Sequence, residues 1–278
     1  MTAQMPMPRP RQDLRLAVVL AAVAAAATVA VIPYLLQLDP ARTAQSAQVP
    51  LPALIAIQAM TMFIVCALLG WAGLRMGHHV GLGAPLLQRW VNRHGDARLR
   101  DRGPATAVGL GIAVAVVILV LSRALDPLLL PPTQVEMTDI VGGRSALYGA
   151  LASFYGGVVE ELQLRLFLMT LIAWAATRLA RLVRRRGGSD GSLSPRIAWL
   201  AILIAALLFG VGHLPAAATI WGLDAGVVLR TLLLNGLGGV VFGWLYWRRG
   251  FEMAVLAHFA ADIVLHALVP LLLPQGVL

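Results

Sequence analysis

The chain has 278 residues, of which 59% are hydrophobic and only 13% are charged. Because a soluble domain carries about 25% charged residues, this composition excludes an ordinary soluble protein and predicts an all-α membrane helix bundle. All 22 basic residues are arginine, and the formal net charge is +9. Arginines of membrane proteins gather in cytoplasmic loops near anionic lipid. The charge therefore indicates a lipid bilayer as partner and no nucleic acid.

Seven apolar runs reach the roughly 20 residues that a helix needs to cross the hydrocarbon core. The first exceeds the apolar core of a signal peptide, which is typically about 7–15 residues, so we expect an uncleaved helix. No repeat or long linker divides the chain, which predicts a single membrane domain, 1–278, with three spans in 1–145 and a four-span core in 146–273. The predicted spans are 16–38, 52–74, 105–125, 146–176, 197–214, 226–247 and 252–273.

The arginines alternate between the loops and so predict the topology. Three lie in the N-terminal tail, six in 75–104, six in 177–196 and two in 248–251, whereas the intervening loops hold one, one and none. Because cytoplasmic loops carry the excess of basic residues, we expect a multi-pass protein of the cell membrane, in a bacterium, with a cytoplasmic N-terminus and an external C-terminus. In the cytoplasmic segment 85–100, Leu86, Leu87, Trp90 and Val91 share one helical face. That pattern predicts a short helix lying on the leaflet.

Charged residues inside the fourth span are the first functional signal. A charge at the bilayer centre costs roughly 2.5–3.5 kcal/mol on insertion scales, so such residues face a bundle interior or a cavity. Glu161 and Arg165 are four residues apart and share a helical face, which allows an ion pair. Glu160 is turned about 100° from Glu161 on an α-helix and is free to point elsewhere. The pair could serve helix packing or chemistry, whereas an unpaired carboxylate is a functional candidate.

Two later spans carry histidines. His213 follows Phe209 by four residues in 209-FGVGHLP-215, where we expect Gly210 and Gly212 to allow a close backbone approach and Pro215 to end the helix. In the last span, His258 and Asp262 are four apart on one face, so the carboxylate could orient the imidazole or join it at a water or metal. Each histidine alone is also typical of a packing residue.

Together, a free glutamate and two histidines on three different spans are sufficient to activate a water molecule. The glutamate would act as general base, and the histidines would stabilise an oxyanion or hold a metal ion. The zinc motif H-E-x-x-H is absent, and no serine lies in the glycine frame of a nucleophile elbow. Counted at 1.5 Å per residue from the arginine-rich loops, Glu160 and His213 lie deeper than His258. Helix tilt or a broken seventh span would be needed to join them.

The motif order E-E-x-x-x-R, F-x-x-x-H and H-x-x-x-N/D on apolar helices resembles the CAAX protease and bacteriocin-processing (CPBP, or Abi) family. The resemblance covers about residues 146–270 and includes a small-residue helix, here with Gly239 and Gly243 as a packing face. It implies an intramembrane endopeptidase, a metalloprotease if zinc is bound, that acts on prenylated or membrane-associated peptides. By resemblance, Glu160, His213, His258 and Asp262 are catalytic, and Glu161, Arg165 and Phe209 support them.

The cofactor stays open at this point. The last motif position is commonly asparagine in the family, whereas Asp262 adds a negative charge that bears on metal affinity. Zn²⁺ held by His213, His258, Asp262 and Glu160 is one alternative, and a metal-free site is the other. Two other functions also remain as alternatives: a proton-coupled transporter that uses the same side chains as a relay, and an inactive membrane scaffold or immunity protein.

Overall fold

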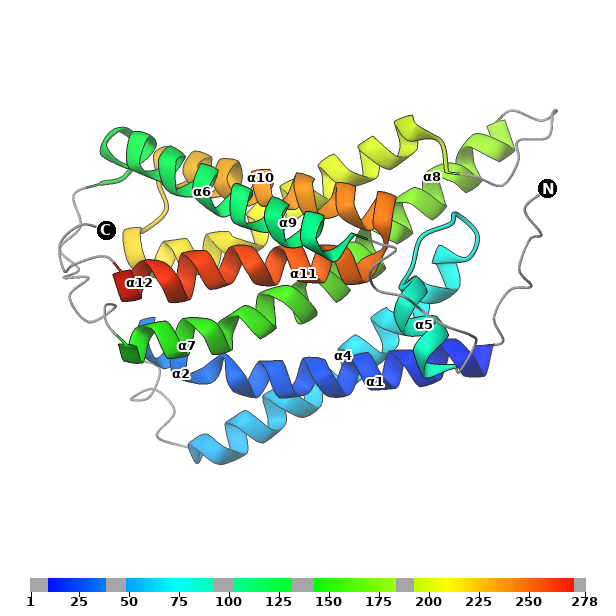
Figure 1. Cartoon of the computed structure of the whole chain (residues 1–278), viewed down its shortest axis with the longest axis horizontal. Coiled ribbons are helices and arrows are strands. Elements are labelled where there is room, and N and C mark those ends of the chain that lie inside the picture. Colours follow the sequence, from blue (N-terminus) through cyan, green and yellow to red (C-terminus); the bar gives the residue numbers. More distant parts are fainter. Residues whose placement is uncertain (1–9, 39–48, 93–102, 132–142, 184–192, 273–278) are drawn as a thin grey trace.

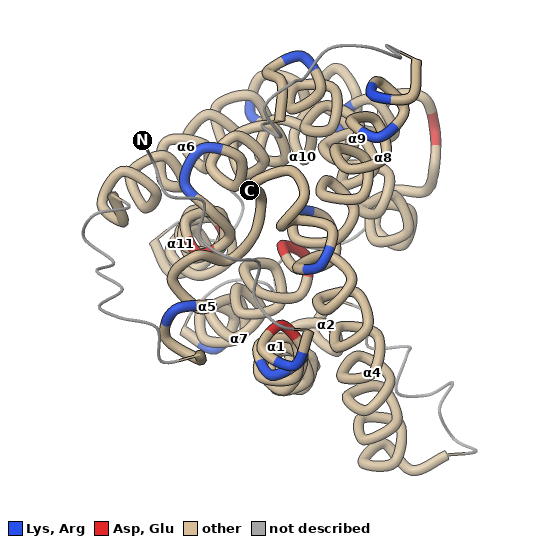
Figure 2. The backbone as a smooth tube through the Cα atoms, turned by 90° about the vertical axis from the view of Figure 1, so that its right-hand side faces the viewer, with Lys and Arg blue, Asp and Glu red and all other residues tan. Residues whose placement is uncertain are grey.

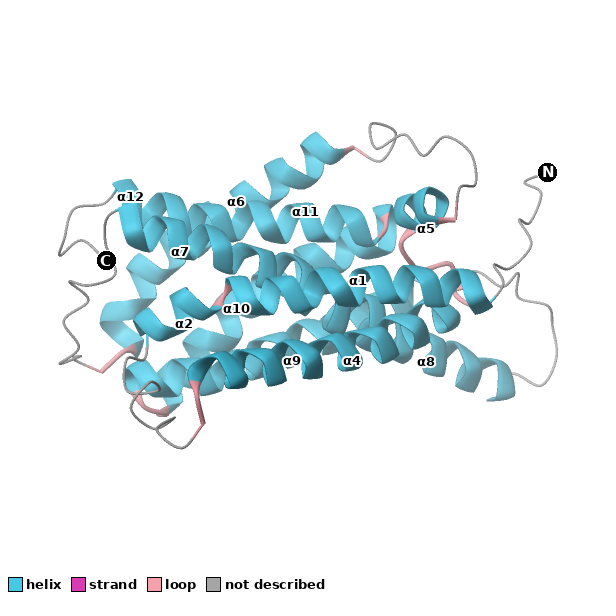
Figure 3. Ribbon diagram, turned by 90° about the horizontal axis from the view of Figure 1, so that it is seen from below, coloured by secondary structure: helices cyan, strands magenta, loops and turns pink. Residues whose placement is uncertain are grey.

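The computed structural model describes residues 10–38, 49–92, 103–131, 143–183 and 193–272, and every regular element in these ranges is helical. Figures 1 and 3 show the long helices running side by side along a common axis. The α-helices are α1 (Pro10–Ala30), α2 (Ile32–Leu38), α4 (Leu51–Gly77), α5 (Pro85–Val91), α6 (Pro104–Leu129), α7 (Gly143–Phe154), α8 (Thr170–Val183), α9 (Pro195–Trp221), α10 (Ala225–Arg249), α11 (Phe251–Asp262) and α12 (Val269–Leu272). The π-helices are η3 (Tyr155–Glu160), η4 (Leu162–Met169) and η5 (Ile263–Leu268).

The predicted seven-span bundle is confirmed. Seven helical runs among the described residues are long and apolar enough to cross a membrane. They are Pro10–Leu38, Leu51–Gly77, Pro104–Leu129, Gly143–Val183, Pro195–Trp221, Ala225–Arg249 and Phe251–Leu272. Large hydrophobic side chains remain exposed along them, for example Leu68 at 63% and Val120 at 64%. Since lipid tails solvate such side chains, this surface is the one expected of a membrane bundle.

The expected helix end at Pro215 is wrong, because α9 continues through this residue to Trp221. Proline removes one backbone N–H donor, yet membrane helices tolerate it where neighbouring groups satisfy the freed carbonyl. The helix stops instead at Gly222, whose φ of 75° is a left-handed conformation that glycine adopts without strain.

Small residues set the contact between α9 and α10. A Cβ on Gly239 would lie 2.8 Å from Cα of Ala206, and one on Gly243 would lie 3.2 Å from the Ile202 side chain. The predicted glycine packing face is therefore present. A Cβ on Gly210 would likewise lie 3.1 Å from Cα of Leu232, which confirms the close approach expected there. A Cβ on Gly212 would meet no atom within 4 Å, so the close approach expected at Gly212 is wrong.

The first span packs into the bundle and does not stand apart from it. Leu16, Leu20 and Ala24 of α1 belong to the buried core. Asp13 is fully buried at the start of α1, where it pairs with Arg75 Nη1 at 3.0 Å and His78 Nε2 at 2.9 Å. These contacts fasten the N-terminal end of α1 to the end of α4.

The short helix α5 lies at the same end of the bundle (Figure 1) and covers part of the predicted interfacial segment, whose residues 93–100 lie outside the described ranges. Leu86, Leu87 and Val91 pack against the core of the protein, and of the four residues on the predicted lipid-facing side only Trp90, at 71%, is largely exposed. Glu252 Oε1 on α11 accepts the backbone N–H groups of Leu86 and Leu87 at 2.8 Å each. This carboxylate joins the first turn of α5 to the first turn of α11.

Arginines lie around the end of the bundle that faces the viewer in Figure 2, at the termini of several helices. The loop between α9 and α10 lies at the opposite end (Figure 1). The positive-inside rule assigns the arginine-rich end to the cytoplasm, and the orientation of the N-terminus follows from this assignment as a prediction.

Cysteine labelling tests this orientation. Cys66 is buried and the only cysteine of the chain, so the background is Cys66→Ala. In intact cells, an impermeant maleimide should label Leu223→Cys, a site 59% exposed between α9 and α10. It should label Trp90→Cys on α5 only after permeabilisation. Labelling of Trp90→Cys alone in intact cells would reverse the topology.

Candidate active site

The glutamate motif of the fourth span lies in π-helical backbone, not in the plain α-helix that the sequence predicted. η3 ends at Glu160 and η4 begins at Leu162, so that Glu161 stands between two widened segments. The Thr170 hydroxyl donates to the Arg165 carbonyl at 3.1 Å, five residues back along the chain. π-Helical turns occur frequently at functional sites, because they change the direction of the side chains that follow.

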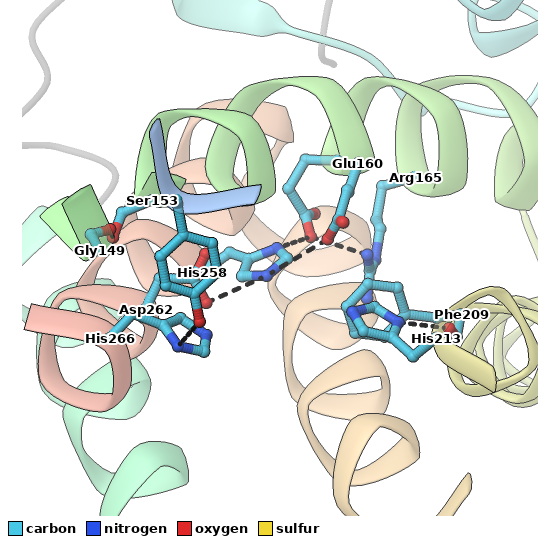
Figure 4. Close-up of polar contacts among 11 residues, drawn as sticks. Gly149, Ser153, Glu160, Arg165, Phe209, His213, His258, Asp262 and His266 are labelled. Carbon is cyan, nitrogen blue, oxygen red and sulfur yellow. Dashed lines mark hydrogen bonds and ion pairs between the residues drawn. The ribbon is translucent and has the colours of Figure 1, made fainter. Parts of the chain in front are cut away.

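Both glutamates point to one imidazole as a result. Glu161 Oε1 lies 2.8 Å from Nδ1 of His258, and Glu160 Oε2 lies 3.8 Å from Nε2 of the same ring (Figure 4). Glu160 thus faces away from Arg165, as expected, but the sequence did not predict that Glu161 would also reach His258. The two carboxylates flank opposite nitrogens of His258, which is 4% exposed.

The predicted pair of Glu161 and Arg165 is present, at 2.7 Å between Oε1 and Nη1, with both side chains buried. Arg165 also donates through Nη2 to the Gly239 carbonyl at 3.3 Å, and its guanidinium lies 4.8 Å from the centre of the Phe209 ring. Hydrogen bonds of this kind are what a buried charge requires to be tolerated. Glu161 therefore links Arg165 and His258.

Two contacts fix the orientation of the His258 ring. Because the Glu161 carboxylate paired with Arg165 is an acceptor, Nδ1 of His258 must carry the hydrogen that it donates. The Phe242 ring stacks on the imidazole at 4.5 Å and 19°. In the neutral ring, Nε2 is then a lone-pair acceptor that faces Glu160 and Asp262. Orienting the imidazole was one of the two roles that the sequence left open for Asp262, and in the structure Glu161 and Phe242 make the contacts that orient it.

Asp262 lies on the Nε2 side of His258, with Oδ1 3.6 Å from that nitrogen. Both this separation and the 3.8 Å to Glu160 exceed a direct hydrogen bond. The Glu160 side chain is 23% exposed and that of Asp262 is 13% exposed. The Nε2 side of the imidazole is therefore the accessible side of the site, and the Nδ1 side is closed.

His213 joins the cluster only through Phe209. Its Nδ1 donates to the Phe209 carbonyl at 2.8 Å, since a carbonyl oxygen can only accept. The Phe209 ring meets His213 edge-on at 4.6 Å and lies 5.5 Å from the His258 ring. The structure therefore brings the other candidates together around His258 and places His213 beyond this aromatic ring.

The four predicted zinc ligands can be tested against these positions. Glu160, His258 and Asp262 approach one another, but His213 does not share a coordination point with them. Within the described ranges, no three or more His, Cys, Asp or Glu side chains are grouped so that they could hold a metal ion. The donor set therefore does not fit zinc in this arrangement of side chains.

Gly156 is a site residue that sequence reasoning missed. A Cβ at this position would overlap Oδ2 of Asp262 and lie 3.2 Å from Nε2 of His258. The absence of a side chain thus makes room for the carboxylate beside the imidazole. The sequence does contain a Gly-Gly pair one helical turn before Glu160. Its role in making room for Asp262 becomes evident only from the packing of span 4 against span 7.

Gly156→Ala is expected to displace Asp262 and lower kcat for any reaction carried out by this cluster. Misplacing a reacting group by about 1 Å costs up to about 10²-fold, so we expect a loss of about 10-fold to 10²-fold. The matched control is Gly212→Ala, where the new Cβ meets nothing within 4 Å. Equal kcat values in the two variants would show that Gly156 does not position Asp262.

The difference in depth predicted between His258 and Glu160 does not exist in the folded bundle. The helix that carries Glu160 runs on to Val183, and Figure 1 shows the end of α8 lying beyond the ends of α10 and α11. The arginines at the end of α8 and those at the end of α10 therefore do not lie at the same level along the bundle axis. Counting from them placed Glu160 too deep relative to His258.

Comparison with known families agrees with the motif reading. Searches among curated proteins and solved structures give no significant match. A family model described as type II CAAX prenyl endopeptidase Rce1-like matches residues 143–264, which include every residue of the three motifs from Glu160 to Asp262. The predicted resemblance to the CAAX protease family is thereby confirmed over residues 143–264, which match the Rce1-like family model.

Proposed function

We propose that this protein is an intramembrane endopeptidase that hydrolyses membrane-associated peptides, prenylated ones among them, with Glu160 as general base. The family match supports a membrane protease of the CAAX type. One observation carries the catalytic assignment: a partly exposed carboxylate, Glu160, faces the accessible nitrogen of a buried imidazole inside an apolar bundle. Glu161 already binds the other nitrogen and Arg165, so of the two glutamates Glu160 is the one left for chemistry.

The proposed reaction uses water as nucleophile. A water held between Glu160 and Nε2 of His258 would attack the carbonyl carbon of the scissile peptide bond, while Glu160 takes one of its protons. The new C–O bond forms as the carbonyl becomes an oxyanion. Glu160 then returns the proton to the leaving nitrogen, the C–N bond breaks, and the products are an acid and an amine. General base catalysis of this kind contributes about 10²–10⁴-fold.

The other residues have separate roles in this proposal. Glu161 and Phe242 hold the imidazole so that its lone pair faces the water. Asp262 lies beside the same nitrogen and limits the positions open to the water. His213 donates Nδ1–H to the Phe209 carbonyl and acts in this proposal through Phe209, whose ring lies 5.5 Å from that of His258.

The decisive experiment measures cleavage of a fluorogenic membrane peptide by the purified protein in detergent, with and without a chelator. We expect cleavage by the wild type that persists with the chelator. Loss of cleavage on chelation and its return with zinc would overturn the metal-free mechanism but keep the protease. No cleavage under either condition, together with proton flux in vesicles, would favour the transporter alternative.

A further inference from the structure

Span 7 carries one more polar residue on the face that builds the site. His258, Asp262 and His266 follow one another at intervals of four, which places them along one side of the helix. The first two are explained by the candidate site. His266 belongs to η5, the π-helical segment that begins directly after Asp262, and the family match ends at residue 264.

His266 has a partner on the first span. The Tyr34 hydroxyl of α2 lies 3.1 Å from Nδ1 of His266, and the two rings meet edge-on at 5.6 Å and 65°. Both residues are half-buried. Figure 4 shows His266 beside Asp262. The N-terminal spans, which the motifs do not reach, therefore supply a hydroxyl group next to the candidate site.

The backbone at His266 packs closely against α7. A Cβ on Gly149 of α7 would overlap the His266 carbonyl, so α7 and η5 touch backbone to backbone at this point. Ser153 Oγ donates to the Gly149 carbonyl at 2.9 Å, one turn further along α7. His266 thus stands on a segment whose position is set by close packing against the helix that leads to Glu160.

Tyr34 and His266 together have one more hydrogen-bond donor than their mutual hydrogen bond uses. A neutral imidazole and a phenol bring one N–H and one O–H, and their mutual hydrogen bond uses one of the two. The structure shows no second hydrogen bond from either side chain to a described residue. Lipid cannot accept the remaining donor, so its natural partner is water or the carbonyl oxygen of a bound peptide.

We propose that Tyr34 and His266 form a hydrogen-bonding subsite for a backbone carbonyl of the peptide substrate. His266 lies eight residues after His258, or roughly 12 Å along the helix at 1.5 Å per residue. An extended peptide advances about 3.4 Å per residue. The subsite would therefore bind a substrate residue about three to four positions from the bond that is cleaved. This inference rests on the proposed endopeptidase function.

The test combines a variant with a series of peptides. Tyr34→Phe removes the hydroxyl but keeps the ring packed on His266. With a long peptide we expect KM to rise about three- to tenfold at unchanged kcat, as for the loss of one hydrogen bond in binding. With peptides truncated to two residues, first on one side of the scissile bond and then on the other, the effect should vanish on one side only. The matched control is Tyr148→Phe on α7, for which no side-chain hydrogen bond to a described residue is present.

Any other outcome would refute the proposed subsite. A lower Tm with unchanged KM would make the pair a structural link between the first and last spans. A KM effect that persists in both truncated peptides, or a fall in kcat alone, would place the role of Tyr34 elsewhere. Failure of the proposed function is separate, because it appears as absent cleavage in the wild type. In that case, equal affinity of wild type and Tyr34→Phe for the long peptide, measured by fluorescence anisotropy, would refute the subsite as well.

Discussion

Glu160→Gln is expected to lower kcat for peptide cleavage by about 10²–10⁴-fold, the loss typical of a removed general base. The amide has nearly the shape of the carboxylate but cannot take a proton from water. Because Glu160 contacts His258 only at 3.8 Å and is 23% exposed, little folding free energy depends on its charge. Helix content and Tm should therefore stay close to the wild type.

Asp224→Asn is the matched control for this variant, since it also changes a carboxylate to an amide. Asp224 caps α10 by accepting the Val227 N–H at 2.8 Å, and asparagine caps helices equally well. Its kcat should equal that of the wild type. A Glu160→Gln protein that retains full kcat would refute the assignment of the base.

Glu161→Gln and Arg165→Gln are expected to act mainly on stability, each costing about 3–5 kcal/mol, the range found when one partner of a buried pair is removed. Glu161→Gln also weakens the hold on His258 Nδ1, so it should lower kcat in addition. The measurement is the free energy of unfolding in mixed detergent, together with kcat in the folded fraction.

The double variant shows whether the two charges are coupled. If Glu161 and Arg165 compensate one another, removing both should cost less than the sum of the single changes. A matched pair of changes at Asp126 and Arg230, which bond at 2.6 Å between Oδ1 and Nε, provides the comparison. There the side chains are 34% and 16% exposed, so the single changes should cost less. Strict additivity at Glu161 and Arg165 would contradict the pairing.

The sequence was sufficient for features that depend on composition and spacing. Long apolar runs predicted seven spans, since a bilayer demands them. The four-residue spacing predicted the pair of Glu161 and Arg165, because such neighbours meet on any regular helix. Glycines four apart likewise predicted a packing face on α10, although not that α9 is the helix it meets. The motif order was enough to indicate the family.

Other features depend on which helices touch, and a single sequence does not contain that information. No local pattern distinguished π-helical from α-helical backbone at Glu160, so the convergence of both glutamates on His258 was missed. Phe242 resembled any apolar core residue until α10 was packed against α11. The role of Gly156 required the position of Asp262, more than a hundred residues later in the chain.

The ion pair inside the fourth span also bears on how the protein is made. Glu161 and Arg165 are four residues apart on one helix, so this segment contains its own counter-ion before any other span is present. During synthesis, the translocon would release span 4 into lipid with those two charges already neutralised against each other. The free-energy cost of moving span 4 from the translocon into lipid then arises mostly from the charge of Glu160. Three further spans must be synthesised before His258 reaches Glu161, so the cluster assembles only after span 4 has been inserted.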